Sequence, residues 1–192
     1  MAATATSGGS TVRPEPCIAL LRGVNLGARN KVPQKALAAS LEAELGVPVR
    51  HHLQSGNLAV ASADAATLGG VVARSIHDRT GLEIPVIVRT LAQLEMLHSA
   101  NPWPDADPLL VHLSIFDGAA TSALQAVVGA DWGGDEIVVV EGGAWMRFAE
   151  SSRSSRLGTT LERRLGVVAA ARNARTVAAL VELVRTLPSD TR

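Results

Sequence analysis

Apolar and polar positions alternate along the chain in a way that predicts short strands separated by helices. The first apolar run, Cys17 to Leu21, is partly β-branched and stops at Arg22-Gly23, which is typical of a buried strand. Pro33 then stands where a helix favours its first turn, and leucine recurs at every fourth position until Gly46. This stripe, which predicts one apolar helix side, consists of Leu37, Leu41 and Leu45.

Three more strands and a second helix complete a first unit. Val49 to Leu53 and Leu58 to Ala61 are joined by a Gln-Ser-Gly-Asn turn, whose glycine and asparagine suit a tight hairpin. A helix is predicted from Asp64 to Gly81, and Ile84 to Val88 closes the unit as a strand. The order of elements is therefore βαββαβ.

The same order recurs in the second part of the chain. A helix predicted from Thr90, with Gln93 completing a capping box, is followed by a connector rich in proline and aspartate. Strands are then predicted at 111–116, 137–140, 144–148 and 167–171, and helices around 124–129, 157–166 and 173–187, the second of these with a stripe of Leu157, Leu161 and Leu165.

Two successive βαββαβ patterns predict an α+β protein made of two ferredoxin-like halves. A right-handed crossover followed by a hairpin favours an antiparallel sheet with helices on one face. The expected organisation is a disordered tail at 1–16, a first half at 17–89, a helix and connector at 90–110, and a second half with an extra helix at 111–192. In this topology the loop after the first strand lies beside the hairpin between the second and third strands.

Composition narrows the class of protein. Apolar residues make up 47% of the chain, yet no apolar run approaches the roughly 18 residues of a membrane span, so a soluble protein without a membrane partner is expected. The single cysteine excludes an internal disulfide, and the first sixteen residues lack the apolar core of a signal peptide. These features predict a cytoplasmic location.

Charge is balanced in total but uneven along the chain. A net charge of zero argues against bulk attraction to nucleic acid. The balance is +3 over 1–90, −8 over 91–150 and +5 over 151–192. Either basic segments serve a site, or the charges are scattered and solvated.

The first candidate site is the loop from Arg22 to Lys31. It carries three cations and two glycines ahead of a predicted helix N-terminus, which is typical of anion binding, but it lacks the Walker and dinucleotide spacings. The neighbouring hairpin adds amides and a hydroxyl. The candidate ligand-binding residues of this half are Arg22, Asn25, Lys31, Gln54, Ser55 and Asn57. The alternative is that glycine and asparagine only shape polar turns.

The second candidate site comprises two basic segments that precede predicted helices in the second half. The topology places the segments around residues 153–156 and 172–176 at one end of the second sheet, where two helix N-termini converge. The candidate ligand-binding residues here are Arg153, Ser155, Arg156, Arg172 and Asn173. The alternative is that the serines and the asparagine act only as N-caps. One cleft shared by all these loops is predicted.

Several strings, in order, resemble the bacterial family called domain of unknown function 1697. They are LLRGVNLGARNKVP, LQSGN, IPVIVRT, NPWP, SSRLGTTLERRLGV and ARNARTV, and they cover nearly the whole chain after the tail. The resemblance implies a duplicated ferredoxin-like arrangement and no established activity. The family pattern usually has lysine at the place of Arg156 and Trp-Asn at the place of Ala174-Arg175, so chemistry based on that lysine or tryptophan is not expected here.

Other chemistry is not supported by the sequence, and no metal or cofactor is predicted. His51 and His52 are adjacent in a strand and point to opposite faces, and the remaining histidines show no ligand spacing. Ser55 lacks the flanking glycines of a nucleophile elbow, and Cys17 is predicted to be an inert core thiol.

Three function classes remain. The first is binding of a small phosphorylated or carboxylated molecule in the basic cleft, and the second is an enzyme that acts on such a molecule through electrostatic stabilisation. The third is an RNA-binding module, which the absence of aromatics from the predicted third strand disfavours. No oligomeric state follows from the sequence.

Overall fold

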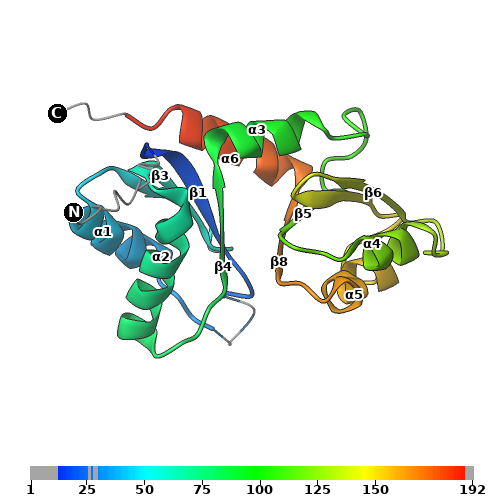
Figure 1. The fold of residues 1–192 in the computed structure, drawn as a ribbon, viewed down its shortest axis with the longest axis horizontal. Helices are drawn as coiled ribbons and strands as arrows, with labels where there is room; N and C mark the ends of the chain where they lie inside the picture. Colours follow the sequence, from blue (N-terminus) through cyan, green and yellow to red (C-terminus); the bar gives the residue numbers. More distant parts are fainter. Residues whose placement is uncertain (1–12, 26, 28–29, 189–192) are drawn as a thin grey trace, which may run out of the picture.

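The computed structural model describes residues 13–25, 27 and 30–188 (Figure 1). The first twelve residues of the predicted tail, and Arg29 of the basic loop, lie outside the described residues. The fold is α+β, with two four-stranded antiparallel sheets and six helices among the described residues.

Strands and helices follow the predicted order. The first part of the chain forms β1 (Glu15–Leu21), α1 (Gln34–Leu45), β2 (Val49–His51), β3 (Asn57–Ala63), α2 (Ala65–Thr80), β4 (Val86–Thr90) and α3 (Leu91–Ser99). The second part forms β5 (Val111–Phe116), α4 (Thr121–Val128), β6 (Glu136–Val140), β7 (Gly143–Arg147), α5 (Arg156–Leu165), β8 (Ala169–Asn173) and α6 (Ala174–Arg185). Most predicted bounds differ from these by one or two residues.

The two sheets have the same topology. Their strand orders are β2-β3-β1-β4 and β6-β7-β5-β8, and every paired strand runs antiparallel to its neighbour. In each sheet the first strand of the unit is central and the last strand lies at an edge. The end of the central strand therefore lies next to the hairpin that precedes the third strand, as the sequence predicts.

One face of each sheet is covered by the two helices of its own unit. Helices α1 and α2 pack on the first sheet and bury Leu41 and Ile76, while α4 and α5 pack on the second and bury Leu161. Leu37 and Leu157 are buried beside them, so the predicted leucine stripes face the interior. Leu45 is only partly buried, because it lies in the last turn of α1.

The prediction of helices on only one face of each sheet is wrong. Helices α3 and α6 contact each other and lie over the opposite faces of both sheets, as the upper layer of Figure 1 shows. They enclose a central core with Ile18 and Leu20 of the first sheet and Trp145 of the second, whose indole N–H donates to the carbonyl of Leu97 at 2.9 Å. The physical reason is that a strand with no polar alternation, such as β1, must be covered on both sides.

Helix α6 connects the two units most directly. It follows β8 of the second sheet, yet it packs against β1 and β3 of the first. Asn173 begins it by accepting the N–H of Thr176 at 2.8 Å, and Thr90 begins α3 with the predicted capping box to Gln93. No helix of the described residues is long and apolar enough to cross a membrane.

Candidate anion-binding pocket

A cavity of about 410 Å³ lies where the two units meet, and we call it the interface pocket. The first unit contributes the loop after β1 and the β2–β3 hairpin, and the second contributes α5 and β8. Its polar lining includes Arg22, Ser55, Thr159, Glu162 and Arg172. The structure therefore brings three of the predicted residues, two of them cationic, into one pocket between the units.

Arg22 forms a two-point ion pair with Glu162 of α5. Its Nε donates to Oε1 at 3.2 Å and its Nη2 donates to Oε2 at 2.5 Å, so the guanidinium presents its planar fork to a carboxylate. Both side chains remain partly accessible, with 49% of the Arg22 side chain and 32% of the Glu162 side chain exposed. Glu162 was not predicted as a site residue, because its spacing along the helix resembles that of any solvated glutamate.

The ion pair shifts both titrations. Burial alone raises the pKa of Glu162, but the hydrogen bonds from Arg22 and from the N–H of Ala169, together with the Arg22 charge, outweigh it and hold that pKa below its usual range. The hydrogen bond to Glu162 and its charge raise the pKa of Arg22. Both groups are therefore charged at neutral pH.

Arg172 is a second cation of the pocket, but its Nε and Nη2 donate to the first unit and its Nη1 donates to the carbonyl of Ala171. Its Nε donates to Oδ1 of Asn57 at 2.6 Å, and its Nη2 donates to the carbonyls of Leu21 (3.1 Å), Ser55 (2.9 Å) and Gly56 (3.1 Å). Burial lowers its pKa to about 10, which leaves the guanidinium charged at neutral pH. Arg172 therefore fastens β8 to the end of β1 and to the hairpin.

The predicted amides of the first unit shape the loop that Arg22 begins. Asn25 has φ 54°, and its side chain donates to the carbonyls of Val32 (3.0 Å) and Gln54 (2.7 Å) while accepting the N–H of Val32 at 3.0 Å. Asn57 is fully buried and donates to the carbonyl of His52 at 2.8 Å and to Oγ of Ser55 at 3.1 Å. These contacts are structural, as the turn interpretation predicts.

The hairpin leaves no room for a side chain at its glycine. Gly56 has φ 78°, and a Cβ added there would lie 2.5 Å from the Cβ of Leu21 and 2.7 Å from Cγ2 of Val24. Positive φ and close approach both require glycine at this position. The hairpin is thereby held against the end of β1 at the wall of the interface pocket.

The remaining predicted residues do not line the interface pocket. Ser155 caps α5 by accepting the N–H of Gly158 at 2.9 Å, and it donates to Asp135 at 2.5 Å. Arg156 donates to the carbonyl of Asp131 at 3.0 Å, and with Ser155 it lines a separate cavity of about 280 Å³. Asn173 is the N-cap of α6, and Lys31 and Arg153 are exposed. The three basic loops thus do not converge completely on one cleft.

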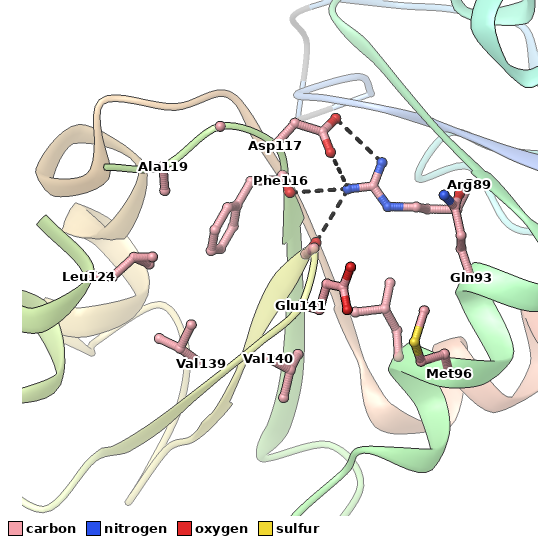
Figure 2. A pocket seen from close by; sticks show the side chains of 13 residues that line it. Arg89, Gln93, Met96, Phe116, Asp117, Ala119, Leu124, Val139, Val140 and Glu141 are labelled. Carbon is pink, nitrogen blue, oxygen red and sulfur yellow. Dashed lines mark hydrogen bonds and ion pairs between the residues drawn. The ribbon is translucent and has the colours of Figure 1, made fainter. Parts of the chain in front are cut away.

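Arg89 was not predicted as a site residue from the sequence. Its Nη2 donates to Oδ1 of Asp117 at 2.7 Å and to the carbonyls of Phe116 (3.0 Å) and Gly142 (3.3 Å), as Figure 2 shows, and its side chain is 8% exposed. It fastens β4 to the end of β5 and to the β6–β7 hairpin. We call Arg89 and Arg172 the two clasp arginines.

The two clasp arginines share a pattern in the sequence. Each is the fourth residue of a five-residue edge strand, and the next residue, Thr90 or Asn173, caps a helix that enters the central core. The shared string of arginine followed by an N-cap residue marks both positions. Their acceptors lie in the other unit, so only the arrangement of the two units reveals them.

The protein is therefore a two-sheet α+β protein whose two units have equal topology and are fastened by reciprocal arginines. Its candidate ligand site is the interface pocket, which Arg172 lines. The chain belongs to the family of proteins of unknown function DUF1697, whose pattern matches residues 15–145. The predicted family membership is therefore confirmed.

A solved structure shares this fold. The conserved bacterial protein SP0830 from Streptococcus pneumoniae is similar with a TM-score of 0.70 and 20% identity, over 90% of this chain and 99% of that one. At this level of identity the likeness concerns the fold alone. No curated protein matches the chain.

Proposed function

We propose that the protein binds a small phosphorylated or carboxylated molecule in the interface pocket. The observation that carries this proposal is the Arg22–Glu162 pair on the wall of a 410 Å³ cavity. The guanidinium fork is already set for two oxygens of an anion, and a carboxylate of the protein itself occupies that position. An incoming anion would take the place of the Glu162 carboxylate.

The exchange has a low energetic cost. A partly exposed ion pair contributes about 0 to 1 kcal/mol, so a ligand with more or better placed oxygens can compete with Glu162. The charge of Arg172 lies on the wall of the same pocket and favours an anion further.

Binding is favoured over catalysis by the hydroxyls of the pocket. Ser55 accepts a hydrogen bond from the Asn57 amide, and Thr159 donates to the carbonyl of Ser155 at 2.8 Å. The third hydroxyl, of Ser114, makes no side-chain hydrogen bond among the described residues, so none of the three is paired with a base there. Burial raises the pKa of the Cys17 thiol to about 12, and that thiol lies in the first core rather than in the pocket. An enzyme acting by electrostatic stabilisation alone remains the second candidate.

We infer further that each unit is a ferredoxin-like copy of the other. The support is the identical strand order with two crossover helices on one face, and the reciprocal placement of the clasp arginines. RNA binding is disfavoured, because β3 carries no aromatic side chain and the second face of the first sheet is covered by α3 and α6. We also propose a cytoplasmic location, since the single cysteine is typical of a protein from a reducing compartment.

The proposed site predicts opposite effects for its two charged residues. Replacing Arg22 with alanine should weaken binding of inorganic phosphate by about 1.5 to 3 kcal/mol, the usual contribution of a hydrogen bond to a charged group. Glu162→Gln should instead strengthen binding, because it removes the competing charge while its amide oxygen can still accept the N–H of Ala169. Calorimetric titration at low salt measures both changes.

Arg153→Ala is the matched control, because Arg153 is exposed and makes no side-chain hydrogen bond or ion pair among the described residues. Its affinity for phosphate should equal that of the unaltered protein. If all three variants bind phosphate equally, or if none of the proteins binds it, the interface pocket is not an anion site.

A further inference from the structure

A second cavity, of about 440 Å³, lies beside the other clasp arginine, and we call it the Arg89 pocket. Figure 2 shows Arg89 and α3 on one side and the ends of β5, β6 and α4 on the other. Its volume falls in the range of about 300 to 1,000 Å³ that small-molecule sites usually have. A small ligand therefore suits it better than a segment of a protein partner.

The Arg89 pocket and the interface pocket stand on the same backbone framework. In each unit the last N–H of the central strand donates to the hairpin glycine, Leu21 to Gly56 at 2.8 Å and Phe116 to Gly142 at 3.2 Å. In each unit the clasp arginine of the other unit donates to the same two carbonyls. The loop after the central strand and the hairpin therefore lie in corresponding positions at the two pockets, whereas α5 completes the interface pocket and α3, α4 and β6 complete the Arg89 pocket.

The side chains at corresponding positions differ in charge. The residue directly after the central strand is Arg22 in the first unit and Asp117 in the second, and the residue before the hairpin glycine is Ser55 in the first and Glu141 in the second. A cation and a hydroxyl are thus replaced by two carboxylates. The carboxylates of the Arg89 pocket therefore favour a cationic ligand, whereas the interface pocket favours an anion.

Glu141 is the carboxylate that is available to a ligand. Asp117 is paired with Arg89, whereas Glu141 makes no hydrogen bond or ion pair within the part of the chain that the structure describes. In Figure 2 it extends from the β6–β7 hairpin toward α3. With Arg89 and Asp117 compensating each other, the pocket carries one net negative charge.

Apart from Gln93, whose side chain accepts the N–H of Thr90 in the capping box, the other side chains of the Arg89 pocket are apolar. Its wall is formed by Met96, Phe116, Leu124, Val139 and Val140, which come from four different elements. Met96 is 47% exposed, so part of its side chain is accessible to a ligand in the pocket. A ligand with an apolar body would bury this wall while its cationic group reached the carboxylate.

We propose that the Arg89 pocket binds a small amphipathic cation, with an ammonium or guanidinium group at Glu141 and an alkyl or aromatic body on the wall of Met96, Phe116 and Leu124. This site is independent of the anion site, because it shares no lining residue with the interface pocket. The two pockets would then be copies of one framework with opposite ligand charge.

The probe for this site is n-hexylammonium, titrated into the full chain by calorimetry at low salt. Glu141→Gln should weaken its binding about tenfold, because the variant loses one charge-assisted hydrogen bond and keeps the shape of the side chain. n-Butylammonium should bind about fifteenfold more weakly than n-hexylammonium, since each buried methylene changes the affinity about fourfold. Hexanoate, which has the same chain length and the opposite charge, should not bind at Glu141, so any heat it gives through the interface pocket should be the same in Glu141→Gln as in the unaltered protein.

Glu44→Gln is the matched control. It makes the same chemical change at an exposed position of α1 that lines neither pocket, and its affinity for n-hexylammonium should not change. The proposal is overturned if n-hexylammonium does not bind, if Glu141→Gln binds it as well as the unaltered protein does, or if both amines bind equally. Phosphate binding should be the same in Glu141→Gln as in the unaltered protein, so either proposal can fail alone.

Discussion

Replacing Arg172 with alanine is expected to lower the free energy of unfolding by about 3 to 5 kcal/mol. The change removes the donor that serves Oδ1 of buried Asn57 and the carbonyls of Leu21 and Gly56. Buried acceptors that lose their donor retain the full desolvation penalty. Chemical denaturation followed by circular dichroism measures the loss.

The matched control is Arg175→Ala. Arg175 lies three residues further along the chain, is exposed, and makes no side-chain hydrogen bond among the described residues, so its replacement should change the free energy of unfolding by less than about 0.5 kcal/mol. Equal losses for the two variants would show that Arg172 does not fasten the units. Arg172→Lys should recover only part of the loss, because one ammonium cannot reproduce the arginine fork.

Replacing Leu41 or Leu161 with alanine should cost about 2 to 5 kcal/mol of unfolding free energy in either case. Leu41 is fully buried between α1 and the first sheet, and Leu161 is 3% exposed in the core under α4 and α5. Each truncation removes transfer energy and leaves a cavity in a packed interior. Denaturant titration of the two single variants measures the cost.

Leu109→Ala provides the comparison for these variants, because Leu109 is 52% exposed in the connector. Its replacement should shift the free energy of unfolding by no more than about 0.5 kcal/mol. Losses below about 0.5 kcal/mol at both Leu41 and Leu161 would contradict the packing of the two leucine stripes.

Local sequence patterns were sufficient to predict the helices and strands, but not which helices cover which face of each sheet. The leucine spacing of α1 and α5 and the apolar runs of β1 and β5 placed these elements within one or two residues. The positions of α3 and α6 could not be derived in the same way, because an amphipathic helix does not indicate which of two sheets it covers. The continuous apolar run from Cys17 to Leu21 was the sign in the sequence that β1 is covered on both faces.

The sequence predicted which loops of the candidate site are neighbours, but not which residues pair with each other there. Arg22, Ser55 and Arg172 do meet in one pocket, since the topology determines which loops are neighbours. Glu162 and the acceptors of Arg172 escaped prediction, because they depend on how the units pack against each other. Cations in a loop do not by themselves require an external anion, because the protein can supply one, as Glu162 does for Arg22.

The position of α6 has a consequence for synthesis on the ribosome. The second face of the first sheet, with Ile18, Leu20 and Ala59, is covered in part by α6, which is translated more than one hundred residues later. At about 5 to 20 residues per second, a nascent first unit exposes this apolar face for several seconds. The face is fully covered only after α6 has left the exit tunnel.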